Sequence, residues 1–293
     1  MDPDLSLLLN GVVSGFLLGA LYAAAAAGLS VSFGMLDVVN IAHPAFMVLG
    51  ALTTALLWEV TGLDPLLLSI LQMPAFWALG AAVYVAYHHF FERRGDEALQ
   101  GLAFFFGIMF IIEVGLVLAI GPDQRFADAS YANTTWSLGE VDFPLRMLVP
   151  AVVSITAIGG LIVFLRRTFT GRAISAVAQD REALRLLAID PVRIKRLAFG
   201  ISIALAALAG GALVVVQPVD AYSGHVFIGR VFAVVIMGGL ASLGGCVLAG
   251  LAFGVIENVT AAFYGPSWSP AVAFGVLLLM LAVRPQGLFG RAA

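Results

Sequence analysis

The amino-acid sequence predicts an all-α polytopic membrane protein, a bundle of eight or nine transmembrane helices of which some are interrupted or re-entrant. Hydrophobic residues make up 61% of the 293 residues and charged residues only 11%, whereas about 25% of the residues in soluble domains are charged. Apolar runs near or above the ~20 residues that cross a bilayer recur along the chain. Glycine and proline, which break helices, fall within or between these runs.

Nine expected spans follow from the apolar runs and from the residues that separate them. The first run follows the acidic start MDPD, which lacks the basic segment of a signal peptide, so we expect it to be retained as a span. The run 227–240 is short and ends at Gly238 and Gly239, so it is either a full crossing or a re-entrant half-helix. The expected spans are 5–33, 45–60, 65–90, 100–121, 146–165, 196–218, 227–240, 246–264 and 268–285.

The distribution of basic residues predicts how these spans are oriented. Eight of the 15 lysine and arginine residues lie in the loop 166–196, and an excess of basic residues marks the cytoplasmic side. We therefore expect this loop and the C-terminus inside the cell and the N-terminus outside. The outer side then holds most acidic residues and three basic ones, Arg125, Arg146 and Arg230. Its longest loop, 122–145, is acidic and aromatic, and is either a connector or a docking surface for an external partner.

Composition excludes several classes of function. The net charge of -3 provides no excess of positive charge for binding nucleic acid, and the single cysteine, Cys246, excludes an intramolecular disulfide and a CxxC site. Lys195 is the only lysine and follows Ile194, so the GxxxxGK[ST] loop that binds nucleotides is absent from the sequence. The HExxH zinc motif and the GxSxG nucleophile motif are absent as well. We therefore expect no catalytic residue, no metal and no cofactor on this chain.

The basic loop 166–196 has the pattern of two short helices. Ile174 and Val177 form an apolar stripe at helical spacing, and Asp180 can cap a second short helix. Asp190 then precedes a proline, as the N-cap of the following span. The loop is either a compact two-helix knob that fits a cleft in another protein or an interfacial segment held by anionic lipids.

Two interrupted apolar runs, one in each half of the chain, are candidate linings of a transport path. Residues 36–46 carry polar groups that are costly in lipid unless they face a pathway or one another, and this segment is either a tight turn or an unwound stretch that lines a path. Glycines interrupt the second run, and paired interruptions of this kind point to a transport site at their interface. Glu113 lies within an apolar span and is either paired, neutral or in contact with substrate. The candidate path residues are Asp37, Asn40, His43, Glu113, Gly238, Gly239 and Ser242.

Glycines recur every four residues in two further places. The first set is Gly11, Gly15 and Gly19, and the second is Gly250 and Gly254. Because this spacing lets helix backbones approach closely in a membrane, we expect these residues to build a tight helix contact and to take no part in chemistry.

Three blocks of the sequence, in order, resemble the LivH-type permeases of the ATP-binding-cassette (ABC) importers for branched-chain amino acids. The blocks are GLSVSFGMLDVVNIAHPAFMVLGA at 28–51, GRAISAVAQDREALRLLAIDPVRIKRLAFGISIALAALAGG at 171–211 and MGGLASLGGCVLAGLAFGVIE at 237–257. The C-terminal RPQGLFGR is also typical of that family. This chain has Pro44 after the histidine of the first block, where the family usually has glycine.

The resemblance implies one permease domain over residues 1–293, with 166–196 as the cytoplasmic coupling loop. It implies two ATPase subunits that bind ATP and magnesium, a second related permease in a heterodimer, and an extracytoplasmic substrate-binding protein, all at the inner membrane of a bacterium. The residues that would contact the ATPase are Arg172, Ala173, Ala176, Asp180, Arg181 and Glu182.

The function that the resemblance implies is ATP-driven import by alternating access, with this chain forming the path and no catalytic site of its own. The substrate would be a branched-chain amino acid or a related solute such as urea, an amide or an aromatic acid. The alternative is an autonomous channel or ion-coupled carrier with Asp37, Glu113 or Glu257 as its ion site.

Overall fold

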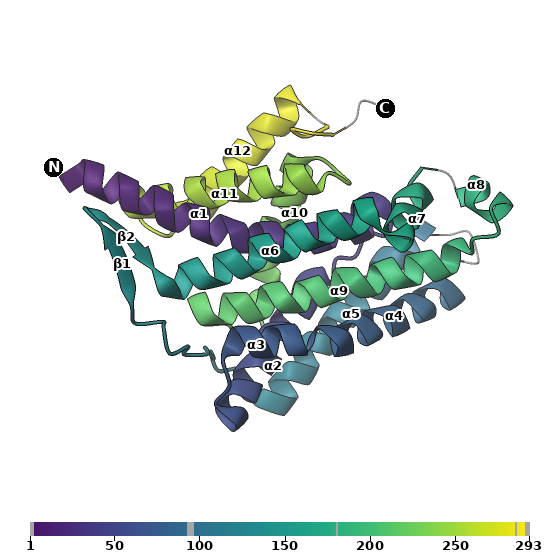
Figure 1. Ribbon diagram of the computed structural model, residues 1–293, viewed down its shortest axis with the longest axis horizontal. Helices are drawn as coiled ribbons and strands as arrows, with labels where there is room; N and C mark the ends of the chain where they lie inside the picture. Colours follow the sequence, from purple (N-terminus) through teal and green to yellow (C-terminus); the bar gives the residue numbers. More distant parts are fainter. Residues whose placement is uncertain (1–2, 93–96, 180, 285, 291–293) are drawn as a thin grey trace.

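The computed structural model describes residues 3–92, 97–179, 181–284 and 286–290. Helices α1, α6 and α9 run side by side along the long axis (Figure 1). The N-terminus and a short β-hairpin lie at one end, and the short helices α7 and α8 lie at the other (Figure 1). The longer helices are α1 (Pro3–Leu29), α2 (His43–Thr61), α5 (Glu97–Ile120), α6 (Leu145–Arg167), α9 (Pro191–Val216) and α11 (Leu243–Tyr264). The others are the π-helix η1 (Ser30–Met35), α3 (Pro65–Leu71), α4 (Met73–Phe90), α7 (Phe169–Val177), α8 (Arg181–Leu186), α10 (Ser223–Gly238) and α12 (Ser269–Val283).

The described helices form the membrane bundle that the sequence predicts. Six of them are long and apolar enough to cross a membrane, when α1 and η1 count as one span, and a seventh is added if the bent pair α3 and α4 is one span. Helices α10 and α12 contain 16 and 15 residues, so each is about 22–24 Å long against a hydrocarbon core of about 30 Å. Their shortness explains why this number is smaller than the eight or nine spans expected.

Helix α9 is the centre of the bundle and is almost entirely buried. It packs against α1, α2, α4 and α6, and small residues let these neighbours approach its backbone. A Cβ atom at Gly210 would collide with the carbonyl oxygen of Met47 in α2, and one at Gly200 would collide with Trp77 in α4. The positions of α2 and α4 are therefore fixed by backbone contact with α9.

The contact between α1 and α11 confirms the prediction from the repeated glycines. A Cβ atom at Gly15 would meet the backbone of Val255 within 2.5 Å, and one at Gly250 would meet the Gly19 carbonyl oxygen at 2.8 Å. Both distances are too short for real Cβ contacts. The two helices thus meet backbone to backbone along this row.

The expected span 65–90 is divided by a bend of 41° between α3 and α4. Pro74 lies in the first turn of α4 and has no backbone N–H, so a continuous helix cannot form its hydrogen bond there. The side chain of Gln72 occupies the bend and donates to the Gly50 carbonyl oxygen (3.1 Å) and to Thr54 Oγ1 (2.9 Å). The bend is thereby tied to α2.

The outer loop predicted between α5 and α6 contains two strands that the all-α prediction omits. β1 (Thr135–Leu138) pairs antiparallel with β2 (Val141–Pro144), and Gly139 supplies the positive φ of 69° that the tight turn requires. The side-chain amide of Asn10 in α1 binds this hairpin twice. Its Nδ2 donates to the Glu140 carbonyl oxygen (3.1 Å), and its Oδ1 accepts from the Asp142 N–H (2.8 Å). The hairpin is therefore fixed to the start of α1.

Candidate functional site

The two interrupted segments, far apart in the sequence, meet in the structure. A Cβ atom at Gly34, in η1, would collide with the backbone of Ala241, between α10 and α11. Each break holds a non-glycine residue in the left-handed region: φ is 59° at Asp37 and 63° at Ala241. Such conformations cost about 1–3 kcal/mol and cluster at binding and switch regions. The two interrupted segments therefore lie next to each other, as their paired positions in the sequence suggested, and each contains a strained backbone residue.

Within the first break, Asn40 and His43 are fully buried, whereas Asp37 is exposed. The Nε2 atom of His43 lies 3.0 Å from the Ala25 carbonyl oxygen of α1, and Asn40 Oδ1 accepts from the Ala42 N–H at 3.1 Å. Ser202 of α9 donates to the nearby Gly28 carbonyl oxygen at 2.7 Å. His43 thus holds the turn to α1, Asn40 closes the turn locally, and Asp37 is exposed.

The second break follows the end of α10 and leads into α11. Gly239 has φ 93°, and Ser242 Oγ caps α11 by accepting from the Gly245 N–H at 3.1 Å. The C-terminal segment covers the last carbonyls of α10, since the Leu288 N–H donates to Met237 (2.8 Å) and the Phe289 N–H donates to Gly238 (3.2 Å). Gly238 and Gly239 are therefore enclosed between α11 and the C-terminal segment.

Helix α10 contacts two glutamates of candidate spans, one through a histidine and one through an arginine ion pair. His225 Nε2 lies 2.7 Å from Glu113 Oε2 of α5, and Arg230 Nη2 lies 2.6 Å from Glu257 Oε1 of α11. Each glutamate is seven residues before the end of its helix, which is about 10 Å from that end. The Arg230 guanidinium also lies 5.9 Å from the ring centre of Tyr22, a cation–π distance.

The two pairs differ in exposure. The side chains of His225 and Glu113 are 52% and 12% exposed, whereas those of Arg230 and Glu257 are 18% and 7% exposed. Arg230, which the sequence analysis places on the outer side, lies inside α10, and its pairing with Glu257 was not predicted. Sequence reasoning also missed His225. The sequence did contain a signal for this site. His225 and Arg230 lie close together in one short apolar segment, and ionisable groups at membrane depth are functional candidates.

Helices α7 and α8 form a compact knob at one end of the bundle, hereafter the knob. Thr168 caps α7 by accepting from the Gly171 N–H at 2.9 Å. α7 packs against α6, α9 and η1, and α8 packs against α7 and α9. The buried residues that anchor the knob are Ala173, Ile174, Val177 and Leu184.

The outward surface of the knob carries Arg172 and two leucines. Leu186 is 88% exposed and Leu187 is 70% exposed, outside every candidate span. Of the expected ATPase contacts, Arg172 is exposed, Ala176 is half-buried and Ala173 is buried against the chain. Asp180 lies outside the described residues, as do the side chains of Arg181 and Glu182.

A polar network, hereafter the Glu92 network, joins the end of α4 to the start of α9. The Glu92 carboxylate accepts from Lys195, from the Tyr84 hydroxyl (2.6 Å) and from His88 Nδ1 (2.7 Å). Burial alone would raise the pKa of Glu92, but these hydrogen bonds and the Lys195 charge outweigh it and hold the pKa below its ordinary value. Lys195 is itself 3% exposed. Sequence reasoning missed this network, although the single lysine of an apolar chain was a signal.

Among the described residues, no group of three or more His, Cys, Asp or Glu side chains is placed to hold a metal ion. The described pairs are instead one acid with one base, or one acid with several donors. Such arrangements can hold helices together or contact a charged solute.

Comparisons with known proteins agree with these features. Residues 11–281 match the family described as the permease component of the branched-chain amino acid transport system. BraD, a high-affinity branched-chain amino acid transport permease of Pseudomonas aeruginosa, is 28% identical over 99% of this chain and 98% of its own length. LivH of Escherichia coli strain K12 is 27% identical over the same shares. LivM of Salmonella typhimurium is 33% identical over 49% of this chain and 33% of its own length. No solved structure matches.

Proposed function

This chain belongs to the family of permease components of branched-chain amino acid transport systems, and from that premise we propose that it forms, with a second permease, the path of an ATP-driven importer. The observation that carries the proposal is the anchored knob between two long spans, with exposed leucines outside every candidate span. A free-standing transporter has no use for such a surface. The proposed substrate class is branched-chain amino acids, with urea, amides and aromatic acids as the related alternatives.

The proposed topology has the N-terminus outside, the C-terminus inside and nine crossings, with α10 and α12 counted. Two features support it. The knob carries Arg172 and Arg185 at one end of the bundle, and the acidic hairpin lies at the other (Figure 1). Basic residues favour the cytoplasmic side.

We assign the ATPase contact to the outward surface of the knob. Arg172, Ala176, Leu186 and Leu187 supply the described part of that surface. Ala173 contributes by anchoring, and Asp180, Arg181 and Glu182 complete the proposed contact. Since α7 touches η1 and α9, displacement of the knob would act on the break at Asp37 and, through the Glu92 network, on α4.

The wall of the path is assigned to the exposed surface around His225 and Glu113. Exposed ionisable side chains within a candidate span cannot face acyl chains without a large cost, so this pair would face water or a partner protein. Asp37 and Ser242, at the meeting point of the two breaks, would form the inner end of the path, and the enclosed Gly238 and Gly239 would shape the backbone behind it. Asn40 and His43 would set the shape of that end from within the chain.

The partners follow from the family. Two cytoplasmic ATPases would hold ATP and magnesium, and a binding protein would deliver substrate at the hairpin end. A heterodimer is favoured because Salmonella typhimurium has both a LivH and a LivM relative of this chain. The location would be a bacterial inner membrane.

Reconstitution tests the function. Proteoliposomes that contain this chain, the second permease and both ATPases, with the binding protein added, should accumulate labelled leucine only when ATP is hydrolysed. Uptake by this chain alone, driven by an ion gradient, would contradict the proposal.

A substitution pair tests the ATPase contact. Leu186→Asp should prevent co-purification of the ATPases, because a carboxylate would replace an apolar contact. Leu138→Asp, at the exposed hairpin on the other end, is the matched control and should leave co-purification unchanged. The reverse pattern would contradict both the contact and the topology.

An ion-coupled carrier is the second candidate, and the contacts of His225 and Arg230 with two glutamates are the observation that favours it. In that case Glu113 or Glu257 would release and rebind a proton during transport. The liposome experiment with this chain alone decides between the two candidates.

A further inference from the structure

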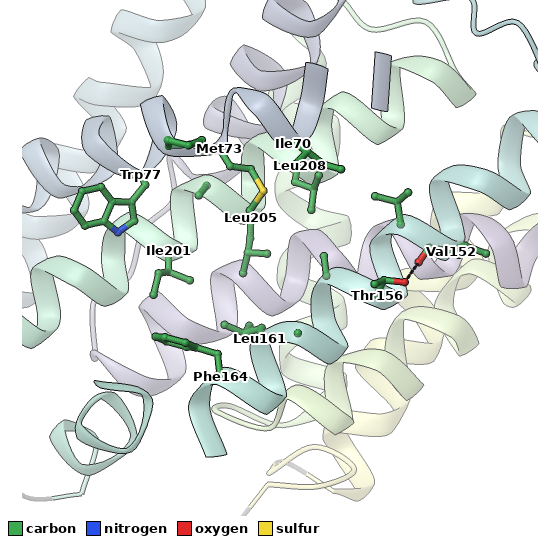
Figure 2. Close-up of a pocket in the computed structure, with 15 residues that line it drawn as sticks. Ile70, Met73, Trp77, Val152, Thr156, Leu161, Phe164, Ile201, Leu205 and Leu208 are labelled. Atoms are coloured by element: carbon green, nitrogen blue, oxygen red, sulfur yellow. Dashed lines mark hydrogen bonds between the residues drawn. The ribbon is translucent and has the colours of Figure 1, made fainter. Parts of the chain in front are cut away.

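An apolar groove of about 620 Å³ lies between the bent pair α3 and α4 and helices α6 and α9 (Figure 2), and it shares no lining residue with the proposed path. Trp77, Phe164, Ile201 and Leu208 are among the residues that line it. The hydroxyl of Thr156, also in the lining, donates to the Val152 carbonyl oxygen of its own helix at 2.7 Å (Figure 2). The groove therefore offers almost no polar partner and suits a hydrocarbon chain.

The groove is open on the α6 side. A Cβ atom at Gly159 or at Gly160 would have no described atom within 4 Å. Helices α6 and α9 are both candidate spans, and α4 belongs to the bent pair that can form one. The opening thus lies at membrane depth.

Two arginines continue the walls of the groove at the knob end. Arg167 follows Phe164 by three residues on α6, and Arg193 precedes Ile201 by eight residues on α9. At 3.6 residues per turn, each lies within about 70° of the mean direction of the groove-lining residues on its own helix. Arg166 and Arg196, on the same two helices, lie about 130° from those mean directions. All four arginines are exposed.

Arg167 and Arg193 have no ion-pair partner among the side chains that the structure describes. Two such cations at the end of an apolar groove complement a molecule with an anionic head and a hydrocarbon tail. An apolar transmembrane helix would fill the groove but would leave both charges unmatched. Basic pockets between transmembrane helices are known to bind anionic lipid headgroups.

We propose that this groove is a binding site for an anionic phospholipid, with the acyl chain between α4, α6 and α9 and the phosphate between Arg167 and Arg193. The lipid would hold α4 and α6 together on a face where they meet mainly through α9. The site is separate from the proposed path, so it stands whichever transport mechanism operates.

Binding to the full-length chain in nanodiscs tests this. Phosphatidylglycerol should bind more tightly than phosphatidylcholine with the same acyl chains. The double variant Arg167→Gln with Arg193→Gln should weaken phosphatidylglycerol binding about 30-fold, because it removes two contacts with the headgroup. The matched control, Arg166→Gln with Arg196→Gln, should change it less than about twofold. An equal loss in both pairs would show diffuse attraction to basic residues and would overturn the site.

A second variant tests the groove itself. Gly160→Phe should fill the open side and abolish retention of phosphatidylglycerol, without touching an arginine. If this variant instead loses the second permease on purification and retains the lipid, the groove is a protein interface and the proposal is wrong.

Discussion

The contact between α1 and α11 and the contacts of α10 hold helices together by opposite means. Along α1 and α11, Gly15 and Gly250 bring backbones into direct contact over several turns. Helix α10 meets the α11 backbone closely at its end, at Gly238, and along the rest of its length its polar contacts join the tips of long side chains, His225 to Glu113 and Arg230 to Glu257. A backbone contact cannot slide without losing its packing, whereas a side-chain pair can re-form after a small shift. We therefore expect α10 to shift during transport, whereas α1 and α11 stay packed together.

The largest expected effect comes from breaking the buried pair of α10. Arg230→Met should lower the free energy of unfolding by about 3–5 kcal/mol, because Glu257 would remain as an unpaired buried charge. Thermal or denaturant unfolding in detergent measures it. The double variant Arg230→Met with Glu257→Met should recover most of the lost free energy of unfolding, because no unpaired charge remains. Equal loss in the single and double variants would show that packing, and not charge, holds α10.

The backbone contact should fail for a different reason. Gly19→Leu should lower the free energy of unfolding by about 3 kcal/mol, because the added side chain meets the Gly250 carbonyl oxygen and forces α1 and α11 apart. Gly107→Leu on α5 is the control, since a Cβ atom there has no described neighbour within 4 Å, and it should be neutral. If Gly19→Leu does not change the free energy of unfolding, the contact between α1 and α11 is not the rigid backbone contact described above.

The Glu92 network is a third kind of contact, whose strength depends on pH. Because the folded protein holds the pKa of Glu92 below its ordinary value of 4.5, the ionised network stabilises at neutral pH, and this contribution is lost as the pH falls from about 4.5 through the lower folded pKa. The melting temperatures of the wild type and Glu92→Gln should therefore differ at pH 7 and converge on acidification. A difference independent of pH would contradict the ionised network.

The smallest expected effect on stability belongs to the exposed pair. His225→Gln should change the free energy of unfolding by less than about 1 kcal/mol, as for other solvent-screened pairs. ATP-driven uptake should nevertheless fall, since His225 is proposed to line the path. Unchanged uptake at unchanged stability would assign His225 no role in transport.

The sequence predicted the features that depend on residue spacing and on composition. The glycine rows identified the contact of α1 with α11, and paired interruptions identified two breaks that meet at Gly34 and Ala241. What it missed depends on three-dimensional pairing. No local pattern relates Glu92 to Lys195 across 103 residues, or Arg230 to Glu257, because each pair forms only when its helices pack.

The bend at Gln72 was missed for a related reason. Pro74 is compatible with either a kink inside one helix or the first turn of a new one. The choice depends on the hydrogen bonds that the Gln72 side chain makes to α2, and these are tertiary contacts.

The central claim is that the exposed side of α10 faces water and moves during transport. Cysteine labelling in the assembled transporter tests it most directly, because the native Cys246 is buried. His225→Cys should react with a water-soluble maleimide at a rate that changes when ATP is trapped. Ile111→Cys, exposed on the other side of α5 from Glu113, should stay unreactive. Absence of labelling at position 225 in both states, or an equal rate in both, would contradict the claim.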